Sequence, residues 1–409
     1  MSSFAEHAVL EPPRAPDGHH SLHDALEALA PMLKASARAV ETARRVPASH
    51  VDAIRATGFF DLVKPAAYGG AERDFATLVE ANLILARNCA STAWVCGLLA
   101  AHQWLVASFP AQAQQDVWGS NADALLCGSY APAARAQAVP GGYRLSGKWS
   151  FASGCDNAHW AVCAAMIPAL ADPGRLEPAF LLVPAADYRV DDTWDVVGLA
   201  GTGSKTLVLD EVFVPGHRIL TFAQTTSGAT PGAEHHRHEP GYRIPMLAVI
   251  PSCLASVAVG AAQGALADYI AATSVRVTRG AVAGGQQKMA EFPTVQLRVA
   301  EAAAAVDAAQ EILLRDLRRV AAAVARGQVL TEEARILSRR GQAYAVALAL
   351  RAVEALNAAT GGMGLDLNHP VQRAWRDVNA IARHISMNWD AVGTMSGQML
   401  LGLTPRGQY

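Results

Sequence analysis

The hydrophobic period of this chain changes twice along its length, and this change restricts the possible folds more than any other feature. From about residue 20 to residue 118, apolar side chains recur at three- and four-residue steps, the spacing of helices buried on one side. From about residue 125 to residue 225 the period becomes two, in short runs bounded by Gly, Pro and Asp, which predicts strands. Helical spacing then returns and continues to the C-terminus. The chain is therefore expected to hold a β unit between two groups of helices.

The length of the chain supports a division into domains. Its 409 residues exceed the size at which a single hydrophobic core keeps growing. We predict an α+β fold, mostly α, with an N-terminal helical domain at 1–124, a central β-barrel-like domain at 125–235 and a C-terminal four-helix bundle at 236–409. In the bundle, Thr331 is expected to cap the start of a long helix.

Charge and cysteine content argue against several classes of partner. The net charge of -2 gives no basic surface for nucleic acid or for an anionic membrane. The six cysteines form no CxxC pair, and the N-terminal segment lacks the pattern of a signal peptide, so we expect a cytoplasmic protein. The segment from Met246 to Ala267 is uncharged and long enough to span a bilayer. Its Gly, Ala, Ser, Pro and Gln content nevertheless favours a helix packed on other helices.

Several common catalytic motifs are absent from the sequence. It has no GxGxxG between a strand and a helix, no GxxxxGK[ST], no HExxH and no GxSxG. The histidines between Glu234 and Pro240 lack the i, i+4 spacing that aims two imidazoles at one ion, so we expect no metal site. Dinucleotide binding by a Rossmann unit, P-loop chemistry and zinc hydrolysis therefore lose support.

A histidine near the C-terminus is the main candidate for catalysis. Read as one helix, residues 376–398 carry an apolar stripe, and His384 lies at the edge of that stripe with Asn388 one turn further on. A histidine that only fills the core is the alternative, and the segment alone leaves both interpretations open. The pKa of an unperturbed imidazole is about 6.5, so modest burial is enough to tune it across neutrality.

Two other stretches suit a flat polar ligand. In KWSFASGCDNAHW, aromatic residues on a strand run into small residues, so that the backbone can approach a ligand closely while Ser150 and Ser153 offer hydrogen bonds. Gly361 and Gly362 end a helix and are expected to leave backbone amides free near the start of the His384 helix.

These stretches together resemble a known family. The sequence is similar to the acyl-CoA dehydrogenase superfamily, and more closely to its branch of two-component flavin-dependent monooxygenases, which includes the oxygenase components of 4-hydroxyphenylacetate and steroid-phenol hydroxylation. The resemblance covers nearly the whole chain. Its motifs are IRATGFFDLVKPAAYGG, STAWV, QDVWG, GSYAP, GYRLSGKWSFASGCDNAHW, GLAGTGSKTLVLDEVFVP, PTVQLRVAEA and HPVQRAWRDVNAIARHISMNWDA. The last of these is the most specific, because it surrounds the active-site histidine of the monooxygenase branch.

The resemblance implies a set of site residues. The catalytic candidates are His384, Ser150 and Ser153. The implied flavin contacts are Trp94, Gly128, Ser129, Tyr130, Ser150, Phe151, Ala152, an arginine at Arg276 or Arg279, Gly361, Gly362, His384 and Ile385. Several relatives have a Ser or Thr where this chain has Ala152. The group that meets flavin N5 is then expected to be Ser150, Ser153 or a backbone amide.

The resemblance also implies a reaction. Reduced FMN or FAD would react with O2 to a C4a-hydroperoxide, which transfers one oxygen to a small organic substrate, aromatic or phenolic in the first instance. Because the chain has no Rossmann unit for NAD(P)H, a separate NAD(P)H-flavin reductase is the implied partner. His384 would either donate a hydrogen bond to the distal peroxide oxygen or deprotonate a phenol. Members of this family usually form homotetramers.

Three alternatives accompany this interpretation. The first keeps the flavin and oxidises an amine to a hydroxylamine or nitroso compound on the same scaffold. The second is an acyl-CoA dehydrogenase, which needs a glutamate base, yet no Glu occurs from Val378 to Tyr409 and no acidic residue lies between Glu239 and Asp268. The third is a non-catalytic scaffold, which would not bind reduced flavin.

Overall fold

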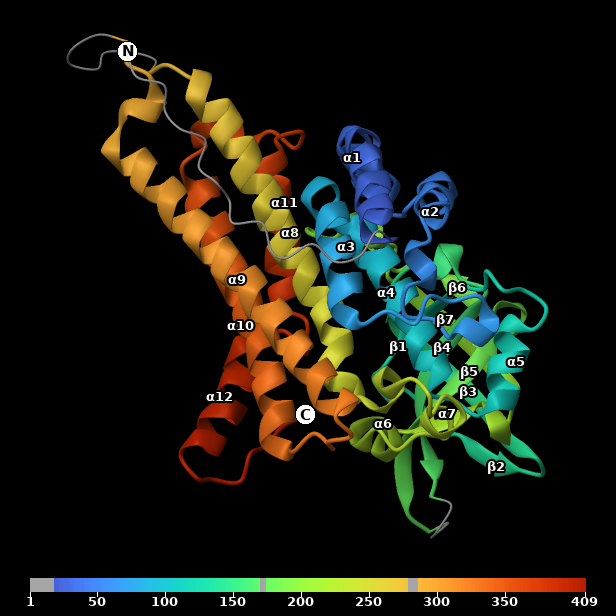
Figure 1. The fold of residues 1–409 in the computed structure, drawn as a ribbon. Coiled ribbons are helices and arrows are strands. Elements are labelled where there is room, and N and C mark those ends of the chain that lie inside the picture. The colour runs from blue at the N-terminus through green and yellow to red at the C-terminus, as the bar shows by residue number, and fades with distance from the viewer. Residues whose placement is uncertain (1–17, 170–173, 279–285) are drawn as a thin grey trace.

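The computed structural model describes residues 18–169, 174–278 and 286–409, and along the chain a β unit follows one group of helices and precedes another. The first group comprises α1 (Gly18–Ala43), α2 (Ala48–Arg55), α3 (Phe75–Asn88), α4 (Ala90–Ala107) and α5 (Ala111–Trp118). In space, α3 and α4 of the first group lie between the C-terminal helices and the β unit (Figure 1). The order of elements predicted from the hydrophobic period is confirmed.

The described strands form two sheets, whereas the sequence predicts a barrel-like domain. One sheet has the order β1-β4-β5-β8 and the other β2-β3-β7-β6. Their bounds are Leu126–Ser129 (β1), Gln137–Val139 (β2), Gly142–Ala152 (β3), Trp160–Pro168 (β4), Leu176–Pro184 (β5), Arg189–Asp191 (β6), Lys205–Pro215 (β7) and Ile219–Thr221 (β8). Strand β1 runs parallel to β4, and the other pairs are antiparallel. The sheets enclose a small core of their own, in which Trp149 is fully buried.

Five helices form the C-terminal part, beyond the short helices α6 (Phe222–Ser227) and α7 (Pro231–His235). They are α8 (Met246–Val275), α9 (Pro293–Ala325), α10 (Glu332–Ala358), α11 (Pro370–Ala382) and α12 (Trp389–Leu400). Thr331 caps α10, as predicted, because its side chain accepts a hydrogen bond from Ala334 N. Short 3-10 turns connect the elements, at Phe59–Asp61 (η1), Ala66–Tyr68 (η2), Cys155–Asn157 (η3), Ala185–Asp187 (η4), Ala200–Thr202 (η5), Gly216–Arg218 (η6), Pro240–Arg243 (η7), Met289–Glu291 (η8) and Gly361–Leu365 (η9).

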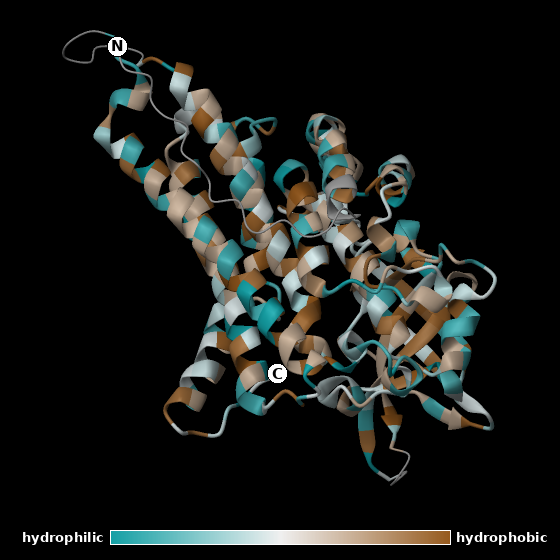
Figure 2. Ribbon diagram, in the orientation of Figure 1, coloured by the Kyte–Doolittle hydropathy of each residue, from teal (hydrophilic) through white to brown (hydrophobic). Residues whose placement is uncertain are grey.

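Helix α8 is the central helix of the molecule. It is long and apolar enough to cross a membrane, but 89% of its most apolar window is buried inside the protein. Figure 2 shows the hydrophobic residues gathered where the N-terminal helices meet the bundle and the strands. One hydrophobic core includes residues of both helical groups and of the sheet that contains β1. This shared core packs the helices against one face of that sheet.

The helix predicted at 376–398 is wrong in one respect. Helix α11 ends at Ala382, and α12 begins only at Trp389, so His384 lies in the turn between them. Asn388 causes the restart, because its side chain accepts a hydrogen bond from Ala391 N at 3.0 Å and caps α12. The Asn388 side chain is therefore engaged in the cap of α12.

Candidate active site

The turn between α11 and α12 fixes the position and the tautomer of His384. Its carbonyl accepts from Met387 N at 2.8 Å and from Asn388 N at 3.0 Å, which closes the turn. Its ring Nδ1 lies 3.2 Å from Ser386 N, a group that can only donate. In the neutral ring the proton therefore sits on Nε2, which makes that atom a hydrogen-bond donor.

The imidazole is held neutral. Burial and, to a smaller extent, the positive charge of Arg339 together lower the pKa of His384 to about 4. A neutral Nε2–H group with Nδ1 already engaged is suited to donating a hydrogen bond. It is poorly suited to taking a proton from a substrate.

Arg339 is a buried guanidinium next to this turn. Only 3% of the residue is exposed, and no carboxylate among the described residues lies within ion-pair distance of it. Its NH2 donates to Ser386 O at 2.9 Å, its NH1 to Gln342 Oε1 at 2.7 Å and its Nε to Gln408 O at 3.4 Å. Burial lowers the pKa of this guanidinium to about 10, so the group stays charged at neutral pH. Sequence reasoning missed it, because an arginine within a helix usually faces solvent.

Trp94 connects His384 to the β unit. Its ring lies edge-on to the imidazole, with centroids 5.8 Å apart and planes at 70°. Its Nε1 donates to Ser153 Oγ at 3.0 Å, and both residues are buried. The structure thus brings three of the predicted site residues together from α4, from the end of β3 and from the α11–α12 turn.

The end of β3 separates the two candidate serines. The register of β3 against β7 shifts between Trp149 and Ala152, and Phe151 adopts a left-handed φ of 64° at this bulge. Ser150 then turns its hydroxyl to Thr206 Oγ1 at 3.1 Å, away from Trp94. Ala152 is fully buried and carries no hydroxyl. Of the three groups left open for flavin N5, the Ser153 hydroxyl is the one beside Trp94.

Phe151 is itself unusual, since a bulky residue in the left-handed region is strained and such strain gathers at functional sites. Its ring is 70% exposed and lies edge-on to the ring of Trp194, at a centroid distance of 5.9 Å. An exposed aromatic ring held in a strained backbone fits contact with a flat ligand.

The turn after β1 carries the predicted residues Gly128, Ser129 and Tyr130. Ser129 Oγ donates to the carbonyl of Ser150 at 2.8 Å, which joins this turn to the end of β3. The Tyr130 hydroxyl is buried without a hydrogen-bond partner among the described residues. A Cβ at Gly128 would lie 3.0 Å from the Tyr130 ring and 3.2 Å from that of His102, so glycine keeps this space open.

His102 is a site residue that the sequence did not reveal. It lies on α4 and is buried, and its Nδ1 lies 2.5 Å from Leu126 O, to which it donates. Its Nε2 therefore carries a lone pair, in contrast to the donor on His384. Burial lowers the pKa of His102 to about 4. The spacing of Trp94 and His102 on one helix was the available signal, but α4 is apolar on all sides and hides it.

Other predicted residues lie elsewhere. Arg276 donates to Thr360 O at 3.0 Å and packs beside Gly361, with Gly362 next in the same turn. This turn precedes α11, whereas His384 follows it, so the 13-residue helix separates the two clusters by about 20 Å. Gly361 and Gly362 therefore lie before the start of α11, and His384 lies beyond its end within one chain. Ile385 is 77% exposed, and Arg279 lies outside the described residues.

These residues fit a reduced flavin. A flat polar ring system needs aromatic contacts, a donor, an acceptor and little water. The described site offers the exposed Phe151 ring, the Nε2–H of His384, a lone pair on Ser153 and the unpartnered Tyr130 hydroxyl. No group of metal-binding side chains occurs in the described part of the chain.

A helical domain, a β unit and a helix bundle that meet at such a site define the acyl-CoA dehydrogenase fold class. The family models for the N-terminal and C-terminal domains of acyl-CoA dehydrogenase match residues 17–121 and 252–389. The missing glutamate separates this chain from the dehydrogenases themselves, since α8 has no carboxylate before Asp268.

Similar proteins identify the branch. The chain is 62% identical over 395 residues to the oxygenase component of FADH(2)-dependent resorcinol hydroxylase from Rhizobium sp. (strain MTP-10005), covering 96% of both chains. It matches the crystal structure of 3-HSA hydroxylase from Rhodococcus sp. RHA1 with a TM-score of 0.89 and 35% identity, over 95% of this chain and 98% of the other. XiaF from Streptomyces sp., solved in complex with FADH2 and glycerol, gives a TM-score of 0.85 and 29% identity over 95% and 97%. The chain belongs to the flavin-dependent monooxygenases of the acyl-CoA dehydrogenase family, as an oxygenase component.

Proposed function

We propose that this protein hydroxylates a small monocyclic phenol of the resorcinol type, using O2 and reduced FAD supplied by a separate NAD(P)H-flavin reductase. The observation that carries the proposal is a buried imidazole donor on His384 and a buried imidazole acceptor on His102, in a chain that is 62% identical over 395 residues to the oxygenase component of a resorcinol hydroxylase. The bound reduced flavin supplies the chemistry of O2 activation and oxygen transfer. The residues of the chain bind the flavin and the substrate, orient them, and exclude water from the site.

His384 acts as the hydrogen-bond donor of the site. Its pKa near 4 keeps the ring neutral at pH 7, so that Nε2–H is present throughout the physiological range. A fixed neutral donor in a buried place stabilises oxygen that carries developing negative charge without releasing a proton into the site. This role selects between the two functions that the sequence left open for His384.

His102 acts as the acceptor for the substrate. Its Nε2 faces Gly128, where a Cβ would lie 3.3 Å from this nitrogen, and its ring lies 5.7 Å from the ring of Tyr130. A phenolic O–H that donates to this nitrogen gains electron density on its ring, which favours attack by an electrophilic oxygen. An aromatic amine, or an aliphatic amine in the neutral form that N-oxygenation requires, would meet the same lone pair with a weaker donor. We therefore prefer a phenol over the amine N-oxygenation alternative.

The assembly and location of the protein are part of the proposal. We infer a homotetramer in the cytoplasm. The apolar side chains exposed near the Arg276 turn and near the C-terminus support burial in an assembly; they are Val275, Met363, Leu365, Leu367, Ile385, Leu400, Leu401 and Leu403.

The test is a reconstituted assay with NADH, a flavin reductase, FAD and air. Resorcinol, other monocyclic phenols and the matching anilines are offered as substrates, and product mass and H2O2 are measured together. We expect a mass gain of one oxygen on the phenols, and little H2O2. The variant His384→Ala is expected to retain flavin binding but to release more H2O2 per NADH, whereas His102→Leu loses phenol affinity. Oxygenation of anilines alone would replace the phenol proposal, and H2O2 as the sole product with every substrate would contradict both.

A further inference from the structure

The Ser153 hydroxyl belongs to a buried chain of hydroxyl groups that leads away from the site. Ser153 Oγ lies 2.7 Å from Ser204 Oγ, and Ser204 Oγ lies 2.7 Å from Thr202 Oγ1. Thr202 Oγ1 lies 2.8 Å from the carbonyl of Leu199. The three hydroxyl residues are almost fully buried, at 6%, 4% and 1% exposure. Trp94 Nε1 joins the other end, at Ser153.

The direction of every hydrogen bond in this chain follows from counting protons. Trp94 Nε1–H can only donate, and the carbonyl of Leu199 can only accept. Four contacts lie between them; the indole proton fills the first, and the three hydroxyl protons are available to fill the other three. Thr202 must donate to the carbonyl, so Ser204 must donate to Thr202 and Ser153 must donate to Ser204. Any other arrangement leaves two oxygens within 2.8 Å without a proton between them.

The Leu199 carbonyl, at the end of this chain of hydroxyl groups, is held in place by other hydrogen bonds. Leu199 adopts a left-handed φ of 56°, and its N–H donates to the buried carboxyl of Asp377 at 2.6 Å. Its carbonyl also accepts from Trp194 Nε1 at 3.1 Å and from Thr202 N at 3.1 Å. The carbonyl cannot rotate away without breaking these bonds. The polarity of the hydroxyl chain is therefore built into the fold.

A consequence follows for Ser153. Its oxygen already accepts from Trp94 and its only proton is used by Ser204, so one lone pair remains for any other partner. Reduced flavin carries a hydrogen on N5 and is a donor there. Oxidised flavin has a lone pair on N5 and is an acceptor. A hydroxyl that can only accept is matched to the reduced form and repels the oxidised form.

We propose that Ser204 and Thr202, which touch neither cofactor nor substrate, are positioning residues that make this oxygenase selective for reduced over oxidised flavin by holding Ser153 as an acceptor. The inference rests on the proposed function, because it needs a flavin whose N5 faces Ser153. It explains how an enzyme fed by a separate reductase can take up reduced flavin in the presence of the oxidised product.

The experiment measures binding and not turnover. Dissociation constants for oxidised FAD and for dithionite-reduced FAD are determined under argon by equilibrium ultrafiltration, for the full-length protein and its variants. In Ser204→Ala the proton of Ser153 is released and can point to N5. We expect oxidised FAD to bind about tenfold more tightly in this variant, the value of one hydrogen bond, with reduced FAD almost unchanged. Ser204→Thr keeps the hydroxyl and is expected to keep the wild-type ratio.

Two further variants test whether the effect depends on the hydroxyl chain: one removes its last hydroxyl, and the other is a control outside it. Thr202→Val removes the last donor of the chain without changing its shape, and is expected to shift the ratio in the same direction as Ser204→Ala. Thr193→Val is the matched control. Thr193 Oγ1 lies 2.8 Å from Thr206 Oγ1, in a separate set of hydrogen-bonded hydroxyl groups that does not include Ser153. An unchanged ratio in both Ser204→Ala and Thr202→Val, or in whichever of the two folds, overturns the inference. Failure of the wild-type protein to bind reduced flavin would instead overturn the proposed function.

Discussion

At the scale of single residues, Arg339 is expected to control the charge of His384. Burial is the larger cause of the low pKa of His384 and the guanidinium is the second, so removing the charge raises this pKa only part of the way back to 6.5. We predict that Arg339→Met raises the pKa of His384, whereas Arg339→Lys, which keeps the charge, raises it less. NMR of protein labelled with 13C-histidine, titrated from about pH 3 to pH 8 and assigned with His384→Asn, compares the pKa of His384 in the three proteins.

The release of H2O2 by the two Arg339 variants is expected to follow the pKa of His384. A higher pKa places more imidazolium in the site at mildly acid pH, and an acidic donor there promotes loss of oxygen as H2O2. Arg339→Met is therefore expected to release more H2O2 as the pH falls from 8 to 6, with Arg339→Lys closer to wild type. A His384 titration that is the same in wild type and Arg339→Met would show that the guanidinium has no electrostatic role.

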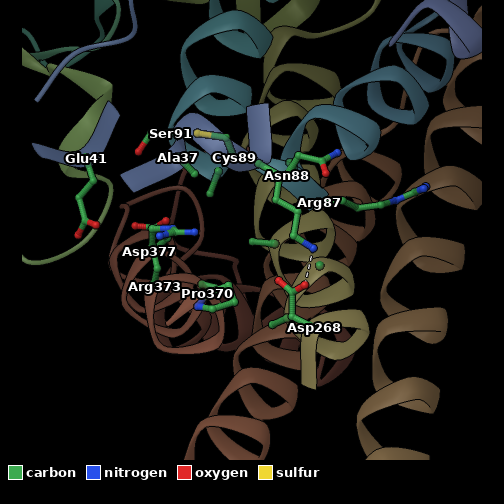
Figure 3. Close-up of a pocket in the computed structure, with 17 residues that line it drawn as sticks. Ala37, Glu41, Arg87, Asn88, Cys89, Ser91, Asp268, Pro370, Arg373 and Asp377 are labelled. Carbon is green, nitrogen blue, oxygen red and sulfur yellow. Dashed lines mark hydrogen bonds and ion pairs between the residues drawn. The ribbon is translucent and has the colours of Figure 1, made fainter. Parts of the chain in front are cut away.

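Asp377 is a second residue whose ionisation is coupled to the fold. It lies beside Arg373 at the wall of a pocket between α1, α3, α8 and α11 (Figure 3). The volume of this pocket, about 40 Å³, has room for water and not for an organic ligand. Burial raises the pKa of Asp377 to about 6, and the hydrogen bond from Leu199 N offsets only part of that increase.

The sign of the pH effect follows from linkage. Between the unfolded pKa of 3.8 and the folded value of about 6, the folded protein holds the proton more tightly, so this carboxyl makes the fold less stable as the pH rises through that window. We predict that wild type loses about 1.4 kcal/mol relative to Asp377→Asn between pH 5 and pH 7, since asparagine keeps the acceptor for Leu199 N and cannot ionise. Urea unfolding of both proteins at the two pH values, at one protein concentration, gives the difference. Parallel changes in the two proteins would contradict the raised pKa.

At the scale of elements, the contact between α3 and α8 depends on glycine. A Cβ at Gly264 would lie 2.1 Å from the carbonyl oxygen of Arg87, and one at Gly260 would lie 2.8 Å from that of Leu83. We predict that Gly264→Ala lowers stability by about 1–3 kcal/mol, because the helices must separate to admit the methyl group. Thermal unfolding followed by circular dichroism measures the loss.

A matched glycine gives the control for this prediction. Gly397 lies in α12, and a Cβ there meets nothing within 4 Å. Gly397→Ala is expected to leave stability unchanged or to raise it by up to about 1 kcal/mol, from helix propensity alone. Equal losses in the two variants would mean that the close approach of α3 and α8 is not the cause.

The elements that the sequence predicted well are those with local signals. Thr331 predicts the start of α10, because its side chain can cap the helix. The small residues of α8 predict a tightly packed core helix. The break at His384 was missed because the apolar stripe continues in phase on both sides of it. Only the cap at Asn388 distinguishes two helices from one, and an asparagine within a helical pattern is not decisive by itself.

Some residues of the site were likewise predicted from the sequence, and others were not. Trp94, Ser153 and His384 were predicted from motifs, and the structure brings them together. His102 and Arg339 were not predicted, since each gains its meaning from a contact far along the chain, with Leu126 and with Ser386. Hydrogen-bond direction in the Ser153 chain likewise depends on a carbonyl whose position no local pattern gives.

At the scale of the whole molecule, the two predicted cofactor clusters do not meet within one chain. The Arg276 turn and the His384 turn stand at opposite ends of α11, about 20 Å apart. Apolar side chains lie exposed beside both, with Leu365 at 84% near the first and Leu401 at 79% near the second. Both observations favour a site that is completed by a second copy of the chain, in which Arg276 of one subunit serves the flavin held by another.

Mixed oligomers test this arrangement directly. His384→Ala and Arg276→Ala chains, carrying different affinity tags, are co-expressed and purified over both tags in sequence, and each variant alone is expected to be nearly inactive in phenol hydroxylation. If each site takes His384 from one chain and Arg276 from another, a quarter of the sites in randomly assembled tetramers combine two intact residues, because each residue is intact in half of the chains. Purification over both tags removes the tetramers of a single variant and raises this share to about two sevenths, so we expect slightly less than a third of the wild-type activity. If both residues served the same site from one chain, no site in the mixture would be intact, and its activity would stay at the level of the separate variants.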